Sequence, residues 1–185
     1  ENIDEVTLVA PFIVHNEIVQ RFKGRAFSWS GENNVLVSVL RKRLGLGEGT
    51  TLIEKGTISL SIADFARHIG SKTLVLVGQD LATTVDGQTH TEASIYSELK
   101  VNKVDLKYRE DSSDGSGNAR KVPGNTVEWV PTLENLYTYL KLFEQWVEAN
   151  PEMKVINTAR LGAKIQGVPY ASFADAASMI AEYSH

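Results

Sequence analysis

Residues 56–90 constrain the fold most, because they predict a glycine-opened helix, a buried strand and a polar loop in immediate succession. Four residues at spacings of four, three and four predict one apolar, inward-facing stripe along the helix: Ile58, Ile62, Phe65 and Ile69. Gly70 is typical of the left-handed residue that ends a helix. Residues 74–77 are apolar on both faces, which is typical of a central strand in a parallel sheet covered by helices. This order predicts an α/β fold.

Three polar or small residues, Gly78, Gln79 and Asp80, follow the predicted strand directly. In open α/β sheets the ligand crevice lies outside the carboxyl ends of the strands, so these residues are well placed to bind a ligand. The Asp80 carboxylate could accept hydrogen bonds from ligand hydroxyls, or could stabilise a turn as aspartate often does. His90 lies in the polar loop beyond, where a neutral imidazole could deprotonate a hydroxyl or could simply be solvated. Asp80 and His90 are therefore the catalytic candidates.

Gly56, Thr57 and Ser59 lie where the predicted helix begins. The first backbone N–H groups of a helix have no partner within it and attract anions by about 0.3–1 kcal/mol per charge at exposed positions. The alternative is that Thr57 or Ser59 only caps the helix. We predict an anion-binding role for these three residues.

A second buried strand is predicted at residues 153–156, and four candidate binding residues follow it: Asn157, Thr158, Gly162 and Lys164. If this strand is a parallel neighbour of residues 74–77, these residues reach the same crevice edge as Asp80. Gly162 and Gly167 would allow a ligand to approach the backbone closely. The alternative is an ordinary transition from strand to loop.

The remaining chain predicts a single α/β domain over residues 1–185 with a hairpin insertion at residues 103–130. Residues 103–108 and 126–130 alternate in polarity and flank a solvated loop, so they predict the two strands of that hairpin. A long helix is predicted at residues 132–149, with Thr132 as its N-cap. A helix ending at Leu44 is predicted to turn three residues inward: Val35, Val39 and Leu40.

Several motifs occur in the same order as in one known family: Gly56-Thr57-x-Ser59, Val77-Gly78-Gln79-Asp80-Leu81-Ala82, Thr89-His90 and Asn157-Thr158-x-x-x-Gly162-Ala163-x-Ile165-x-Gly167. Over residues 56–167 the chain resembles the Maf proteins, the motility-accessory-factor glycosyltransferases. The resemblance implies a Rossmann-like three-layer sandwich with a mostly parallel sheet, similar to bacterial sialyltransferases. It implies transfer of a nonulosonic (sialic-type) acid from a CMP-sugar to serine or threonine of flagellin or another protein acceptor. A second branch resembles 6-hydroxymethylpterin diphosphokinase.

The glycine-rich Gly-x-Gly-Pro-Ser loop that this family places upstream has no counterpart in residues 1–55. We therefore expect a fragment or short form that lacks the first strands of the domain. Two alternatives to glycosyl transfer stay open: a pterin diphosphokinase-like phosphotransferase, and a non-catalytic interaction module of the glycosylation machinery. An unpaired sheet edge would favour self-association as a homodimer.

Composition narrows the function classes. The absence of cysteine excludes disulfides, thiolate catalysis and cysteine-based zinc sites. The net charge of −4 argues against broad nucleic-acid binding. No run approaches the roughly 20 apolar residues of a membrane helix, so we expect a cytoplasmic protein. No two histidines have the helical spacing of a metal site, and we expect a nucleotide sugar as substrate with neither a metal nor a bound cofactor.

Overall fold

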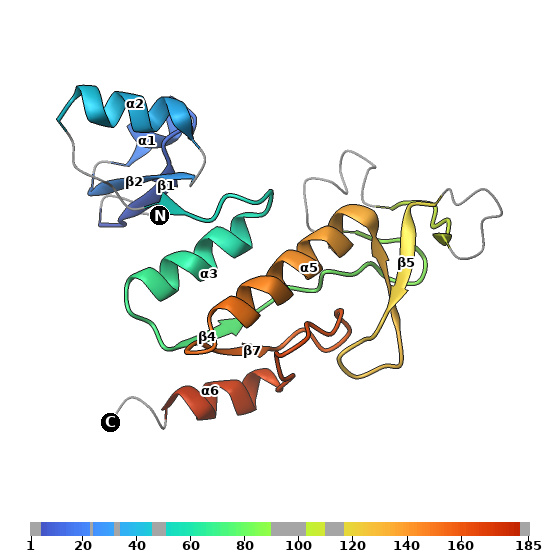
Figure 1. The fold of residues 1–185 in the computed structure, drawn as a ribbon. Coiled ribbons are helices and arrows are strands. Elements are labelled where there is room, and N and C mark those ends of the chain that lie inside the picture. The colour runs from blue at the N-terminus through green and yellow to red at the C-terminus, as the bar shows by residue number, and fades with distance from the viewer. Residues whose placement is uncertain are drawn as a thin grey trace. The chain divides into compact units, whose positions relative to one another are not determined.

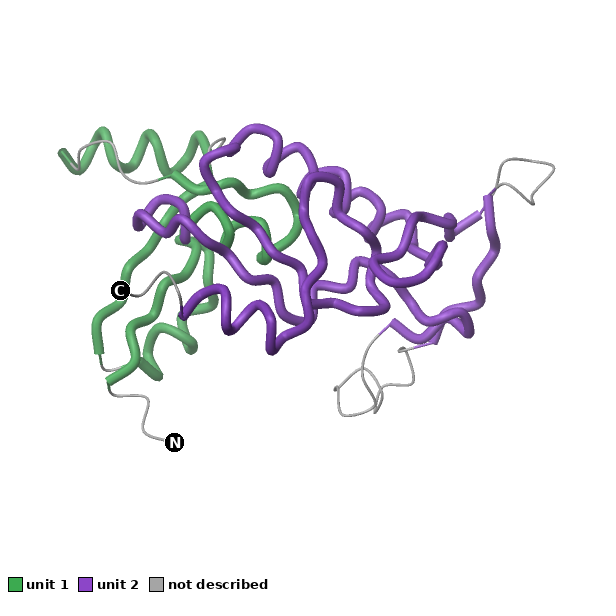
Figure 2. The backbone as a smooth tube through the Cα atoms, turned by 90° about the horizontal axis from the view of Figure 1, so that it is seen from below, with its two compact units in different colours: residues 1–65 green, residues 66–185 purple. Residues whose placement is uncertain are grey.

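The computed structural model describes residues 5–22, 24–31, 34–45, 51–89, 103–109 and 117–181. The chain divides into two compact units, unit 1 (residues 1–65) and unit 2 (residues 66–185), with the boundary inside helix α3 (Ile58–His68), as Figure 2 shows. Parallel strand pairing occurs in both units, so the predicted α/β class is confirmed. That residues 1–185 form a single domain stays a prediction.

Unit 1 contains a three-stranded parallel sheet with the strand order β1-β2-β3. Figure 1 labels four of its elements: β1 (Leu8–Pro11), α1 (Asn16–Arg21), β2 (Ala26–Gly31) and α2 (Val35–Arg43). The fifth element is the short strand β3 (Thr51–Leu52). A helix lies between each pair of consecutive strands, as a parallel connection requires. Helix α2 begins after Asn34, whose side-chain oxygen accepts a hydrogen bond from the Val37 N–H at 3.2 Å.

The predicted inward faces of two helices are wrong. On α2, Val37 is buried, whereas the three residues expected inside are exposed: Val35, Val39 and Leu40. On and just beyond α3, three members of the predicted stripe are more than half exposed: Ile58, Ile62 and Ile69. The buried residues of α3 are instead Leu60, Ser61, Ala63 and Asp64.

Two hydrogen bonds explain why α3 buries this other face. The Ser61 hydroxyl donates to the Ile53 carbonyl, and the Asp64 carboxylate accepts from the Ile53 N–H at 3.2 Å. Because Ser61 and Asp64 lie three residues apart, both bonds fall on one side of the helix and hold that side against residue 53. The apolar stripe on another side is left exposed.

Unit 2 is built on a parallel pair of strands, β4 (Thr73–Leu76) and β7 (Lys154–Asn157), in which Leu76 lies opposite Asn157. Figure 1 shows α5 (Glu134–Ala149) and α6 (Phe173–Ala181) on opposite sides of this pair. Consecutive residues of β7, Val155 to Asn157, are all buried, as expected of a strand covered on both faces. Both predicted strands are therefore present as parallel neighbours. The predicted burial of the first strand is wrong, since only Leu76 of β4 is buried and Val77 is 65% exposed because β4 ends at Leu76 and Val77 begins the turn.

The hairpin in unit 2 uses different strands from the predicted ones. Strands β5 (Ala119–Val122) and β6 (Val130–Leu133) pair antiparallel, with Val122 opposite Val130. Pairing of residues 103–108 with residues 126–130 is thus wrong, and Tyr108 forms only an isolated bridge to Ala119. The physical reason is that residues 124–126 bond instead to the loop after β7, beginning with the Asn125 N–H, which donates to the Gly162 carbonyl at 3.0 Å.

Thr132 is not the N-cap of α5, as the sequence predicts, but a fully buried residue of β6. Its hydroxyl donates to the Leu81 carbonyl at 2.7 Å. Leu81 has a φ of 51°, a left-handed conformation that is uncommon for a residue with a bulky side chain. The bond from Thr132 therefore helps to hold an unfavourable backbone conformation beyond β4. The buried side of α5 carries Leu140, Phe143 and Trp146.

Among the helices of the described residues, none combines the length and the apolarity that crossing a membrane requires.

We predict that Thr132→Val lowers the free energy of unfolding by about 1–3 kcal/mol, because it removes a buried hydrogen bond while keeping the shape of the side chain. Urea denaturation measures this change. Thr138→Val is the matched control, since the Thr138 hydroxyl bonds the Glu134 carbonyl on the exposed side of α5. Equal stability of the two variants would contradict the assigned role of Thr132.

Candidate functional site

The carboxyl ends of β4 and β7 form a strand-end junction, made of residues 76–80 and 157–163. The backbone N–H and the hydroxyl of Thr158 both donate to the Leu76 carbonyl, at 3.0 and 2.8 Å. Farther along, the Ala163 N–H donates to the Asp80 carbonyl at 2.8 Å. The two loops that carry the predicted site residues are therefore neighbours, which confirms the expectation that they share one edge.

The turn after β4 has an unusual backbone. Gly78 has a φ of 70° and Leu81 a φ of 51°, so two left-handed residues lie within four positions. Gln79 is half-buried and Asp80 is exposed between them. The left-handed conformation is unstrained for Gly78 but unfavourable for Leu81, and unfavourable backbone conformations concentrate at functional sites. The exposed Asp80 carboxylate can accept hydrogen bonds from a ligand hydroxyl at this position.

Two asparagines hold the loop after β7 at Ala159. The Asn157 side-chain oxygen accepts a hydrogen bond from the Ala159 N–H at 3.0 Å, and the Asn125 side-chain nitrogen donates to the Ala159 carbonyl at 2.7 Å. The other polar atoms of these side chains, Asn157 Nδ2 and Asn125 Oδ1, are buried and have no hydrogen-bond partner among the residues that the structure describes. Asn157 and Thr158 thus organise the loop, and one donor and one acceptor remain for a water molecule or a ligand group.

The glycine at position 162 is required by the contact between the two loops. A Cβ atom there would lie 2.9 Å from the Asp80 carbonyl oxygen and 3.0 Å from the Asp80 Cα. Gly162 therefore permits a close approach of the chain to itself. The predicted approach of a ligand to this glycine stays a prediction.

Five predicted site residues come from outside the two sequence segments of the junction. Gly56, Thr57 and Ser59 lie in unit 1, where Gly56 has a φ of 79° just before α3 begins. His90 lies outside the described residues. Lys164 is exposed just after the junction, in the loop that follows β7.

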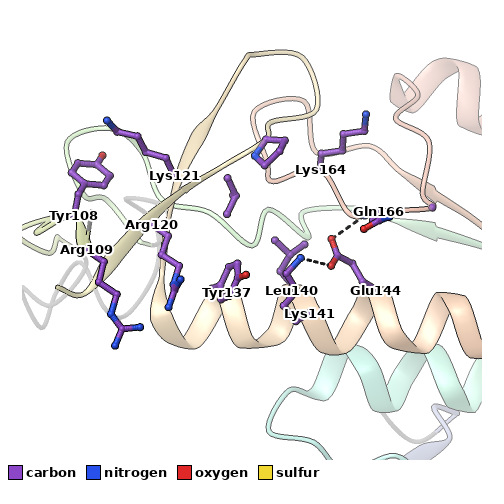
Figure 3. Close-up of a pocket in the computed structure, with 13 residues that line it drawn as sticks. Tyr108, Arg109, Arg120, Lys121, Tyr137, Leu140, Lys141, Glu144, Lys164 and Gln166 are labelled. Carbon is purple, nitrogen blue, oxygen red and sulfur yellow. Dashed lines mark hydrogen bonds and ion pairs between the residues drawn. The ribbon is translucent and has the colours of Figure 1, made fainter. Parts of the chain in front are cut away.

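Lys164 also lines a groove in unit 2 with a volume of about 680 Å³ (Figure 3). The groove lies among β5, α5, residues 108–109 and residues 164–167. We call it the cationic groove, because five of its lining side chains are basic: Arg109, Arg120, Lys121, Lys141 and Lys164. Two tyrosines, Tyr108 and Tyr137, also line it.

Two carboxylates on α5 fix three of these cations. Glu134 accepts hydrogen bonds from Arg120 at 2.7 and 3.3 Å and from Arg109 at 3.4 Å. Glu144 accepts from the Lys141 ammonium at 2.7 Å and from the Gln166 N–H at 3.1 Å. The hydrogen bond to Glu144 raises the pKa of Lys141 above its ordinary value. Helix α5 therefore holds both the basic side chains and the 164–167 loop in place.

The other two cations, Lys121 and Lys164, form no ion pair with any residue that the structure describes. The Lys121 ammonium lies 5.1 Å from the ring centres of both Tyr108 and Trp129. These rings are 6.4 Å apart and nearly perpendicular. The sequence prediction found only Lys164 of this groove. The adjacent basic residues Arg120 and Lys121 lie in the segment predicted as an insertion. This basic pair was the sequence signal that could have indicated an anion-binding surface there.

No group of three or more histidine, aspartate or glutamate side chains is arranged to hold a metal ion within the described residues. No protein-family model matches the chain, and neither a curated protein nor a solved structure matches it.

We predict that Gly162→Ala destabilises the protein by about 1–3 kcal/mol, because the added methyl group forces the two loops of the junction apart. Gly162→Val, with a larger side chain, should cost more. Urea denaturation of the three proteins measures both steps. A Gly162→Ala variant as stable as the parent protein would contradict the tight contact with Asp80.

Proposed function

We propose that the chain is a glycosyltransferase-like domain that binds a CMP-activated nonulosonic acid and transfers the sugar to serine or threonine of a protein such as flagellin. One observation carries this proposal. The two segments that resemble the Maf proteins, residues 77–82 and 157–167, meet at the carboxyl ends of neighbouring parallel strands. Ligands of open α/β sheets bind at such ends. The Rossmann-like three-layer arrangement belongs to the same proposal and is supported by the parallel pairing in both units.

Each candidate residue has a role in the proposed reaction. The acceptor oxygen bonds to the anomeric carbon of the sugar, the bond from that carbon to the phosphate oxygen breaks, and CMP leaves. Lys164 would attract the donor phosphate, and Gln79 and Asp80 would bond the hydroxyls of ribose or of the acceptor. His90 would take the proton of the acceptor hydroxyl. At the start of α3 the N–H groups would attract an anionic group: Gly56, Thr57 and Ser59.

The way in which the loop after β7 is held in place supports these proposed roles. The side chains of Asn157 and Thr158 form hydrogen bonds that hold this loop. The absence of a side chain at Gly162 lets the loop lie against the turn that carries Asp80. A transferase gains rate from side chains that are already in position before the substrate binds. In this proposal these three residues position the Gln79-Asp80 turn and Lys164 relative to each other.

We expect calorimetry on the chain to detect binding of CMP and of CMP-N-acetylneuraminic acid. Asp80→Asn should weaken binding of the donor by about tenfold, because a hydrogen bond to a charged group is lost. Asp105→Asn, at another exposed aspartate of unit 2, is the matched control and should leave affinity unchanged. If neither ligand binds at millimolar concentration, the donor assignment is wrong. Magnesium-dependent ATP consumption with hydroxymethylpterin would instead indicate the diphosphokinase.

We predict that His90→Ala lowers the transfer rate by about 100- to 10,000-fold and leaves donor affinity nearly unchanged, since proton transfer matters in the transition state. The measurement is the transfer rate to an acceptor peptide beside donor affinity. His68→Ala, at an exposed histidine of α3, serves as the control. Normal turnover of His90→Ala would refute the base role without affecting the binding proposal.

A further inference from the structure

We infer that the cationic groove is a binding site for a small molecule that carries anionic phosphate or carboxylate groups. The inference goes beyond glycosyl transfer, because it is argued from the groove alone and holds for any such anion. Five basic side chains gather here in a chain whose net charge is −4. A cluster of one sign in a concave surface raises the local concentration of ligands of the opposite sign.

The charges of the groove do not cancel. Two carboxylates, Glu134 and Glu144, contact three of the five cations. Lys121 and Lys164 add two further positive charges that no described carboxylate pairs with. The groove therefore keeps an excess of positive charge that a ligand with more than one negative charge would match.

The basic side chains are also held in position before a ligand binds. Glu134 bonds two atoms of the Arg120 guanidinium, which in turn lies 4.7 Å from the ring centre of Tyr137. About a third of the Arg120 side chain is exposed, at 35%. Aromatic contacts hold the ammonium group of Lys121 as well. Fixing such long side chains in advance lowers the entropy that binding would cost.

The size and the distribution of charge indicate the class of ligand. A volume of about 680 Å³ lies within the range of roughly 300–1,000 Å³ typical of small-molecule sites. Figure 3 shows Arg109, Arg120 and Lys121 toward one end of the groove and Lys164 at the other, with Tyr137 between them. A ligand with separated anionic groups would contact both ends. Val122 and Leu140, both buried, are the aliphatic residues next to the groove.

Two sources could supply this chemistry, a nucleotide phosphate and the carboxylate of an acidic sugar, and separate ligands distinguish them. Calorimetry at about 50 mM salt would use pyrophosphate, CMP, N-acetylneuraminic acid and uncharged cytidine. We expect pyrophosphate to bind and cytidine not to bind. Binding of CMP identifies the phosphate source and binding of N-acetylneuraminic acid the carboxylate source. Failure of all three anions at millimolar concentration would overturn the inference.

The double variant Lys121→Gln/Lys164→Gln tests whether the anion binds in the cationic groove. Both lysines are exposed and form no ion pair with a described residue, so their replacement leaves the bonds of Glu134 and Glu144 intact. We expect anion affinity to fall at least tenfold, since each substitution removes one charged hydrogen-bond donor. Lys72→Gln, at an exposed lysine of unit 2 outside the groove, should change little. Equal losses in the control, or no loss in the double variant, would overturn the inference.

The inference and the proposed function fail in different experiments. Pyrophosphate binding that depends on Lys121 and Lys164, in a chain that transfers no sugar, supports the groove and contradicts the transferase. The opposite result is sugar transfer that depends on His90, without binding of pyrophosphate, CMP or N-acetylneuraminic acid in the groove. That result would overturn the inference and support the transferase.

Discussion

The site in unit 2 depends on the parallel pairing of β4 with β7. The bond from the Thr158 hydroxyl to the Leu76 carbonyl joins residues 82 positions apart, and it lies where both strands end. Closing so long a loop costs entropy before any contact compensates for it. The buried side chains of Val155 and Ile156 provide that compensation on β7. In the folded chain the loops that follow the two strands bond to each other at the same end of the pair.

A second set of bonds connects the junction to the hairpin and to α5. Thr83 donates its N–H to the Pro131 carbonyl, and the Thr132 hydroxyl donates to the Leu81 carbonyl. Pro131 and Thr132 both belong to β6, and β6 leads directly into α5. Helix α5 carries Glu144, which bonds the Gln166 N–H beyond the junction. The turn after β4, the loop after β7 and the cationic groove therefore share one framework, and a change in β6 is expected to affect all three.

The sequence could predict those parts of the fold that follow from local pattern. The apolar runs predicted two parallel neighbouring strands, of which β7 is largely buried and β4 is not. The polar residues that follow these runs predicted the neighbouring loops with Asp80 and Thr158. The orientation of helices was not predictable in the same way. A stripe such as Ile58 and Ile62 shows which side of a helix is apolar, whereas the buried side of α3 is set by hydrogen bonds to Ile53, which no periodicity reveals.

The same limit applies to Thr132 and to the groove. A threonine just before an apolar helix is typical of an N-cap, and only the position of Leu81 in space shows that its hydroxyl has another acceptor. The groove combines residues from 108 to 167, which come from four separate segments. Their basic character is visible in the sequence, but their proximity follows from the pairing of β5 with β6 and from the bond between Glu144 and Gln166.

The basic residues of the groove divide into two kinds that act over different distances. Lys121 and Lys164 are exposed and unpaired with described carboxylates, so their attraction for an anion extends into solvent and is screened beyond about 8 Å at physiological salt. Arg120 is held by Glu134 and Tyr137, so it acts at contact distance through a fixed, planar set of donors. In an acidic chain the lysines would draw an anion toward the groove, and the arginine would fix its orientation once it arrives.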